Sequence, residues 1–337
     1  MPKLLPFPVL FTGLVVGLLL LITSQFVTSM KHLDKVINKS SHSSDKVRVA
    51  LLLEGPTYDQ GWNSSALESM TELQKRFNFS LEIANNIKPE QITKVAEKYA
   101  ANDYDLILGH GLIFSDPFTD VALRYPKSHF VSFNGEAPHP NQTTIRYDMK
   151  PAGKLVGILA AKMSKSDKVG YILVDKPTEL LQLEGFIEGV KKASPNTSIV
   201  VGKVPDFFND IEGAIRTTRD MISQGVDVIY TTGDSFNLEV ITEAQRAGVF
   251  TIGYIADQRY IAPDYVLVSM MQDVRQCYRI IMEQFIQGEL PNGKVMYGLA
   301  EGVNHLSQFG HMVPANVRED LERELQNLIP SRGSYGG

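Results

Sequence analysis

Side chains suited to binding a small polar molecule follow several short apolar segments of this sequence. The segments are predicted strands, and the residues after them are rich in aromatic rings, amides, acids and glycines. In an open parallel sheet, ligands bind beyond the carboxyl ends of the strands, so these positions are the candidate binding residues. They are Tyr58, Asp59, Trp62, Asn63, Gly109, His110, Gly111, Phe114, Gly233, Asp234, Ser235 and Asp257.

The candidates around Trp62 could recognise a nucleobase. Asp59 and Asn63 could hydrogen-bond to the edge of a base while the Trp62 ring stacks on its face. The alternative is that Trp62 packs in the core and Asn63 caps the following helix. His110 could contact a ligand or act as a pH-sensitive latch, or it could be a turn histidine bonded to the backbone.

No arrangement typical of an enzyme is found in the sequence. The block Gly233-Asp234-Ser235 superficially resembles one in hydrolases, but the Asp-x-x-His that such an enzyme needs later in the chain is missing. No G-x-S-x-G, Walker or H-E-x-x-H motif occurs. His305 and His311 have no acidic or thiol neighbour in the sequence that would complete a metal site. We therefore expect no enzymatic activity, no cofactor and no metal.

Length and composition indicate a globular protein of two domains. The chain has 337 residues, of which 43% are hydrophobic and 21% are charged,. Its 33 basic and 38 acidic side chains give a net charge of -5, so there is no basic excess for nonspecific binding of nucleic acid,. The single cysteine, Cys277, excludes an internal disulfide,.

The N-terminal segment is predicted to hold the protein at the cell membrane. Residues 4–27 contain no charge, and this run exceeds the roughly 20 residues that cross a bilayer,. A cleaved signal peptide and a retained anchor over residues 1–30 both fit the run, and its length favours the anchor. By the positive-inside rule, the lysines after the run would keep the large domain in the cytoplasm. A leader with a very short N-terminal tail usually exports the domain behind it, and we expect an extracytoplasmic domain.

Strand and helix patterns alternate in two series along the rest of the chain. Short apolar runs such as 47–53 and 169–174 are separated by helical patterns. This alternation predicts right-handed βαβ units and two parallel sheets, with a junction near residues 147–150. The predicted parts are residues 1–30 (anchor), 31–45 (polar linker), 46–148 with about 255–290 (lobe 1), and 149–254 with about 291–330 (lobe 2).

Segments along most of the chain carry a resemblance to a known family. Among them are EGPTYDQGWNSSALESM at 54–70, YDLILGHGLIFSDP at 104–117, QGVDVIYTTGDSFNLEVITEAQRAG at 224–248 and IGYIADQ at 252–258. In order and spacing they resemble the basic membrane protein family, the substrate-binding proteins of nucleoside ABC importers. The resemblance spans roughly residues 46–315. It implies the α/β type I periplasmic-binding-protein fold, with two doubly wound lobes, a hinge and a ligand between the lobes.

The sequence departs from the family pattern at three places. Family members usually carry an aspartate that binds ribose hydroxyls where this chain has Ile255, and a lysine near the position of Gln272. Isoleucine cannot accept a hydrogen bond from a hydroxyl, so we expect weak or absent affinity for ribonucleosides. The leader also lacks the cysteine that anchors lipoproteins, so the hydrophobic segment is expected to anchor the chain instead.

Two functions are implied by the resemblance. The first is a membrane-anchored solute-binding protein for a nucleoside, base or related solute, with an ABC permease as a candidate partner. The second rests on the GHG loop and IGYxxDQ, which are similar to the Med-type branch, credited with positive regulation of competence. A regulator of that type would act through protein partners. Direct DNA binding of the kind seen in repressors with this fold is not expected, because residues 1–45 hold a hydrophobic run and a polar linker in place of a helix-turn-helix.

Overall fold

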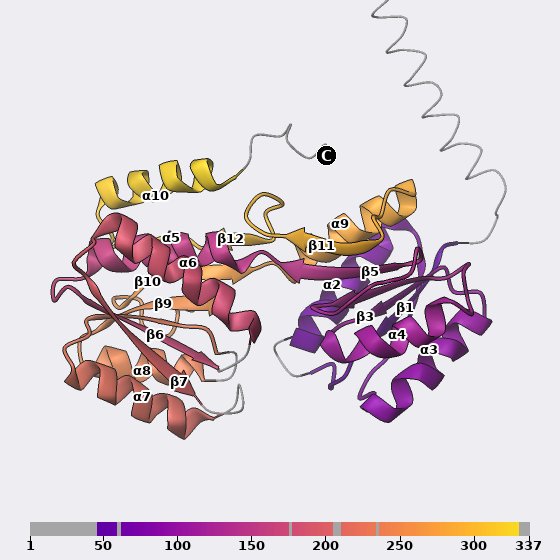
Figure 1. The fold of residues 1–337 in the computed structure, drawn as a ribbon, viewed down its shortest axis with the longest axis horizontal. Helices are drawn as coiled ribbons and strands as arrows, with labels where there is room; N and C mark the ends of the chain where they lie inside the picture. The colour runs from indigo at the N-terminus through magenta and orange to yellow at the C-terminus, as the bar shows by residue number, and fades with distance from the viewer. Residues whose placement is uncertain (1–45, 59–61, 175–176, 205–209, 234–235, 330–337) are drawn as a thin grey trace, which may run out of the picture.

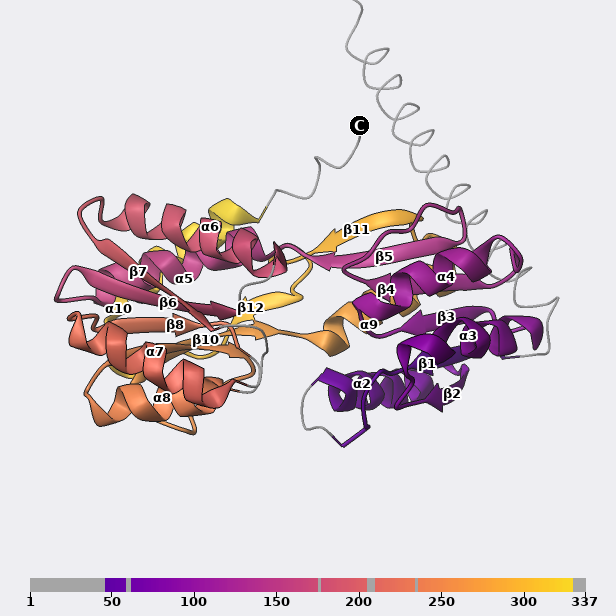
Figure 2. The ribbon, with the colours of Figure 1, turned by 60° about the horizontal axis from the view of Figure 1, so that its bottom comes forward.

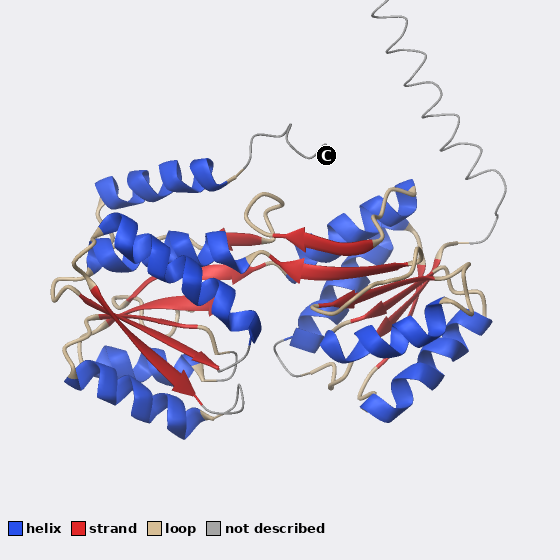
Figure 3. Ribbon diagram, viewed as in Figure 1, coloured by secondary structure: helices blue, strands red, loops and turns tan. Residues whose placement is uncertain are grey.

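Two α/β lobes make up the described part of the chain. The computed structural model describes residues 46–58, 62–174, 177–204, 210–233 and 236–329. Each lobe has a six-stranded sheet with helices on both of its faces (Figures 1 and 3). The predicted anchor, the linker and the candidate residues Asp59, Asp234 and Ser235 lie outside the described residues.

The first lobe is built on a parallel sheet in the order β11-β5-β4-β3-β1-β2. Its strands are β1 (Arg48–Leu52), β2 (Ser80–Ala84), β3 (Leu106–Gly109), β4 (His129–Phe133), β5 (Gln142–Tyr147) and β11 (Gly293–Tyr297). Its helices are α2 (Trp62–Phe77), α3 (Ile92–Ala101), α4 (Ser115–Ala122) and α9 (Val274–Gln287), with short 3-10 turns at Pro89–Gln91 and Leu112–Phe114. Helix α2 packs on α9, and α3 packs on α4.

The second lobe has the sheet order β12-β10-β9-β8-β6-β7, and its pairs are parallel except β10 with β12. Its strands are β6 (Lys168–Val174), β7 (Ser198–Val204), β8 (Val228–Thr231), β9 (Phe250–Ile255), β10 (Val266–Gln272) and β12 (Asn304–Leu306). Its helices are α5 (Met149–Met163), α6 (Pro177–Ala193), α7 (Ile211–Ser223), α8 (Asn237–Arg246) and α10 (Ala315–Leu328). Figure 2 shows α7 and α8 together on one side of this sheet and α5 and α6 on the other.

Local sequence explains why the helices begin and end where they do. Helix α9 starts after Asp273, whose carboxylate accepts a hydrogen bond from the Gln276 backbone N–H at 2.9 Å,. It ends at Gly288, which takes the left-handed conformation that closes many helices, with φ 71°,. Helix α7 starts in the same way, with Asp210 accepting from the Gly213 N–H at 2.9 Å.

The chain passes between the lobes at three places within the described residues. It runs from β5 into α5 at Asp148, from β10 into α9 at Asp273, and from β11 into β12 through residues 298–303. Strand pairing therefore differs from the predicted lobe limits. We expected about 255–290 in lobe 1, but residues 266–272 pair within the second sheet. We expected about 291–330 in lobe 2, but residues 293–297 pair within the first sheet.

Three strands were not predicted, and their composition explains why. Strand β5 begins with Gln142, Thr143 and Thr144, which are polar but fully buried. Their side chains are satisfied inside the lobe; the Thr144 hydroxyl, for example, accepts from the Gly135 N–H at 3.0 Å,. Strands β11 and β12 are short and half-exposed, so they carry little apolar signal. Among the described helices, none combines the length and the apolar composition that a membrane crossing requires.

Candidate functional site

The carboxyl ends of the strands in the two sheets point toward each other. In Figure 1 the arrowheads of the first sheet are directed at the second lobe, and those of β6 and β7 at the first lobe. The nine candidate residues that the structure describes lie in α2 or in the segments at these strand ends. The prediction that the candidate residues share one edge of each sheet depends on the parallel arrangement of the strands that precede them,.

In the first lobe, Trp62 and His110 form one tightly bonded unit. Their rings stack with centroids 3.8 Å apart and an angle of 18°. The Trp62 indole N–H donates to the His110 carbonyl at 3.2 Å, and the His110 Nε2 lies 2.9 Å from the Trp62 carbonyl. The edges of Phe133 and Tyr147 close around the Trp62 ring. Trp62 and His110 thus make the contacts expected if the Trp62 ring packs in the core and His110 bonds to the backbone.

The partners of His110 determine its tautomer. A carbonyl can only accept, so the proton must be on Nε2, which donates to Trp62 O,. The other nitrogen, Nδ1, lies 2.9 Å from the Tyr278 hydroxyl and must accept from it. Burial raises the pKa of Tyr278 well above its usual range, so this hydroxyl keeps its proton,. The fully buried His110 thus joins the start of α2 to α9, the helix that follows the second crossing.

Other first-lobe candidates have structural partners as well. The Asn63 side chain accepts a hydrogen bond from the Gly55 N–H at 3.3 Å, so it closes the loop after β1. Phe114 is fully buried and packs against Phe118. The Phe114 side chain also lies so close to Gly109 that a Cβ there would be 2.4 Å away, and only glycine fits.

Two further groups of the first lobe at this edge are exposed. Tyr58 is 81% exposed, and Glu54 is exposed directly after β1. The Glu54 carboxylate is the nearest neighbour of Gly111, because a Cβ there would lie 3.5 Å from its Oε1. Glu54 was not among the predicted site residues, since a single acid after a strand carries no distinctive spacing.

In the second lobe, the segment after β8 packs against the residue that precedes helix α8. Gly233 lies against the ring of Phe236, and a Cβ at Gly233 would overlap that ring at 2.0 Å. The Asn237 Oδ1 accepts from the Thr231 hydroxyl at 3.0 Å, whereas the buried Asn237 Nδ2 has no hydrogen-bond partner among the described residues. A buried amide donor without a partner is costly, so this NH₂ group is a candidate contact that the sequence did not indicate.

The last residue of β9 is the one that departs from the family pattern. Ile255 has φ 67°, a left-handed conformation that a β-branched residue rarely adopts,. The Gln258 side-chain oxygen accepts from the Tyr254 N–H at 3.0 Å, and the Gln258 backbone N–H donates to Ser269 Oγ at 3.0 Å. Gln258 therefore shapes the loop from within the lobe, which explains why glutamine suits that position.

Asp257 has a strong partner that the sequence analysis did not consider. Its two carboxylate oxygens accept from the guanidinium of Arg259 at 2.6 to 3.1 Å. The hydrogen bonds from Arg259 lower the pKa of Asp257, so the carboxylate is ionised at neutral pH,. A ligand hydroxyl would have to share this carboxylate with Arg259.

The three crossings meet at the sulfur of Met149. The Gln272 side-chain amide, from the second crossing, and the Asn304 amide, after the third, each place their nitrogen 3.3 Å from Met149 Sδ. Asn304 Nδ2 is also 3.3 Å from the Asp148 carbonyl. Burial, together with the nearby Glu301, raises the pKa of Asp148. Gln272, the second departure from the family pattern, is thus part of the hinge.

The structure therefore brings the candidates into two groups. Tyr58, Trp62, Asn63, Gly109, His110, Gly111 and Phe114 belong to the first lobe, and Gly233 and Asp257 to the second. Within the first group, Phe114 and His110 are fully buried, so their direct role is to support the loops around them. No cluster of three potential metal ligands occurs among the described residues.

A family model matches nearly the whole described part of the chain, and this match shows the family of the protein. The model of the PnrA-like ABC transporter substrate-binding proteins, Bmp, matches residues 46–335. The chain belongs to this family. The predicted resemblance to the basic membrane protein family is thereby confirmed.

Relatives of the Bmp chain carry two kinds of name. The transcriptional activator protein med of Bacillus subtilis is 29% identical over 86% of this chain and 89% of its own length. A solved structure of a transcriptional activator of the comK gene from Bacillus halodurans is also 29% identical, covers 84% of this chain and 98% of its own, and has a TM-score of 0.77. A purine-binding protein of Brucella abortus is 24% identical over 88% of this chain and 84% of its own.

Proposed function

We propose that this chain is a membrane-anchored binding protein whose two lobes close on a nucleobase or a related solute, and that it discriminates against ribonucleosides. Membership of a substrate-binding family and the purine-binding relative support a small-molecule ligand. The observation that carries the finer part is Ile255, which is apolar and has a left-handed backbone at the end of β9.

The position of Ile255 gives a physical reason for the discrimination. A site built to hydrogen-bond a ribose hydroxyl loses about 1–3 kcal/mol when a buried partner is absent. Aspartate tolerates positive φ far better than isoleucine, so an aspartate would occupy this backbone with less strain. Isoleucine at this position offers no acceptor to a ribose hydroxyl,.

Asp257 is poorly placed to substitute for that carboxylate, because Arg259 already holds it through a bidentate pair. Glu54 and Tyr58 of the first lobe, which are exposed at the strand ends, are the polar groups that we assign to base recognition. Trp62 and His110 support the first-lobe loops through their stacked rings and their hydrogen bonds to the backbone.

A calorimetric titration of the full-chain protein tests the proposal. Adenine, guanine, hypoxanthine and uracil are compared with the corresponding ribonucleosides. We expect at least one base to bind and its ribonucleoside to bind about tenfold more weakly or not at all, in keeping with the loss of one hydrogen bond. Micromolar binding of any ribonucleoside to the wild-type protein would overturn the proposed discrimination.

Two substitutions at position 255 separate charge from backbone strain. Ile255→Asp restores a carboxylate, and Ile255→Asn relieves the same left-handed strain without a charge. We expect Ile255→Asp to gain affinity for the ribonucleoside by about tenfold and Ile255→Asn to gain much less. Equal gains in both variants would mean that loop strain, and not the missing carboxylate, limits binding.

A regulatory role is the second candidate, because the two relatives that are 29% identical are named as transcriptional activators. It would require partners other than a permease. Deleting the gene in the source organism and measuring uptake of labelled base beside the transcript profile distinguishes the two roles. Loss of uptake supports transport, whereas unchanged uptake with altered transcripts supports regulation.

A further inference from the structure

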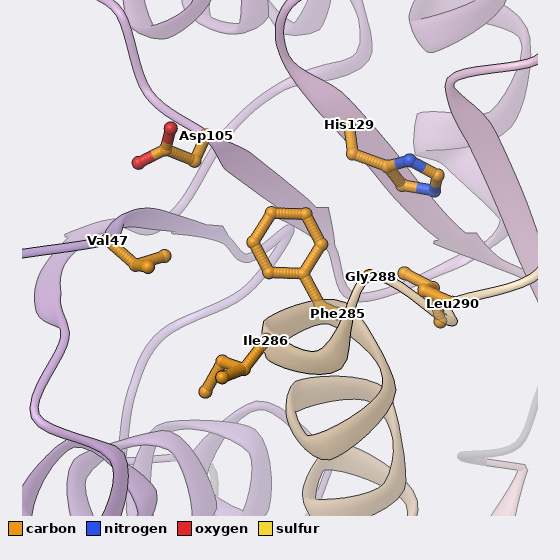
Figure 4. Close-up of a pocket in the computed structure, with 7 residues that line it drawn as sticks. All are labelled: Val47, Asp105, His129, Phe285, Ile286, Gly288 and Leu290. Carbon is orange, nitrogen blue, oxygen red and sulfur yellow. The ribbon is translucent and has the colours of Figure 1, made fainter. Parts of the chain in front are cut away.

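A pocket lies on the first lobe, at the amino ends of its strands and therefore on the edge opposite the other lobe. Its volume is about 290 Å³. The chain segments around it are the starts of β1, β3 and β4 and the end of α9 (Figure 4). The lining residues are Val47, Asp105, His129, Phe285, Ile286, Gly288 and Leu290.

The polar side chains of this pocket are acceptors of hydrogen bonds. Asp105 is exposed, and its carboxylate accepts one hydrogen bond, from the Arg48 backbone N–H at 2.8 Å. Among the described residues no other group bonds to this carboxylate. A carboxylate can accept about four hydrogen bonds, so Asp105 keeps most of its capacity as an acceptor.

His129 is a neutral acceptor because of its neighbours. The Thr143 hydroxyl donates its proton to the Pro291 carbonyl at 2.5 Å, so it can only accept from His129 Nε2, 2.8 Å away,. The proton is thus on Nε2, and Nδ1 carries a lone pair. Burial lowers the pKa of His129 to about 4, so the ring does not become a cation at neutral pH,.

The end of α9 adds negative potential and an aromatic face. A helix carries partial negative charge at its carboxyl end, and α9 has no basic residue in its last turn to offset it,. The Phe285 ring stands between the Asp105 and His129 side chains in Figure 4, and its centroid is 6.2 Å from that of His129. Aromatic faces attract cations, most strongly where water is partly excluded.

We propose that this pocket binds a small organic cation. The carboxylate of Asp105, the face of Phe285 and the carboxyl end of α9 would hold an ammonium group. Val47, Ile286 and Leu290 would cover a short apolar body, and His129 Nδ1 would accept a hydrogen bond from a hydroxyl or N–H on it. An anion would meet acceptors only, so the pocket discriminates by charge.

Choline is a suitable probe, because 3,3-dimethylbutan-1-ol has the same shape with carbon in place of the charged nitrogen. Binding of both to the full-chain protein, in a maltoside detergent that contains no choline, is measured by saturation-transfer NMR and calorimetry. We expect choline to bind at least about tenfold more tightly than the neutral alcohol. Equal binding of the two compounds, or no choline binding up to about 10 mM, would overturn the proposal.

Two variants locate the binding. Asp105→Asn keeps an acceptor for the Arg48 N–H but removes the charge, and we expect it to weaken choline binding about tenfold. Asp103→Asn is the matched control: it removes an acid two residues away that does not line the pocket, and asparagine tolerates its φ of 55°,. Equal effects of the two variants would show that only the overall charge matters. The comparison of choline with its isostere in the wild-type protein remains decisive if Asp105→Asn is unstable.

Discussion

Single residues in this protein show where function and backbone geometry meet. Six non-glycine residues have positive φ among those described, and five of them are asparagine or aspartate, the types that tolerate this conformation,. The sixth is Ile255, in the loop where the family usually has an aspartate. Strain of this kind costs about 1–3 kcal/mol and is retained where the surrounding structure imposes it. The backbone at the end of β9 therefore holds a conformation that isoleucine disfavours,.

The neutral, buried state of His129 predicts a specific dependence of stability on pH. Its pKa is about 4 in the folded protein and about 6.5 when unfolded, so the unfolded chain binds more protons between these values,. The free energy of unfolding should therefore fall as the pH drops from about 6.5 toward 4, with a contribution of about 2 kcal/mol from this residue. Urea unfolding at pH 7 and pH 5 measures the change.

His129→Gln is the comparison for this prediction, because its amide can donate to Thr143 but does not titrate. The variant should lose less stability between pH 7 and pH 5 than the wild-type protein. Carboxylates such as Asp257, whose pKa is lowered by Arg259, contribute equally in both proteins and cancel,. An identical pH dependence in the two proteins would show that His129 is not the group responsible.

At the scale of elements, helices α5 and α6 approach each other so closely that four positions between them have no room for a side chain. Gly153 and Gly157 of α5 face Gly185 and Gly189 of α6, with paired glycines four residues apart on each helix. A Cβ on any of them would lie 2.0–2.2 Å from a backbone oxygen of the other helix. Backbone oxygens cannot move away cheaply, so these positions require glycine.

Gly157→Ala should therefore destabilise the protein although alanine favours helices. The added methyl group would meet the Phe186 carbonyl oxygen at 2.2 Å, and relieving this overlap must separate the two helices. We expect a loss of about 2 kcal/mol in the free energy of unfolding, measured with urea. Ile187→Ala, on the half-exposed side of α6, is the control and should cost less than about 1 kcal/mol,. An unchanged or increased stability of Gly157→Ala would contradict the close packing.

At the scale of the whole molecule, the hinge is a bundle of three chain crossings that share buried contacts. Met149 Sδ receives amide groups from both other crossings, and Tyr278 after the second crossing bonds to His110 of the first lobe. A change in the angle between the lobes must therefore be accommodated at these shared contacts.

Attachment to the membrane is a prediction for the complete chain. We expect residues 4–27 to be retained, so that the protein sediments with membranes and carries its original N-terminal region in mass spectrometry. Replacing Leu18 and Leu19 with arginine should release it, because charges in the centre of a span cost several kcal/mol. Replacing Ser41 and Ser43 with arginine is the control and should leave attachment intact. A soluble product that begins near Met30 would show that the segment is a cleaved signal peptide.

The sequence by itself determined the order of most strands and helices, and its quoted segments carried the resemblance to the family. Apolar runs such as residues 47–53 and the helical spacing of Leu67, Met70, Leu73 and Phe77 are local patterns, and local patterns survive in the fold,. Tertiary structure alone decided which polar groups met. His110 and Tyr278 are 168 positions apart in the sequence, and Thr143 and Pro291 are 148 positions apart. The pocket on the first lobe is lined by residues 47, 105, 129, 285, 286, 288 and 290. Such contacts depend on how distant segments are placed by the sheet and the crossings, and no local pattern encodes that placement.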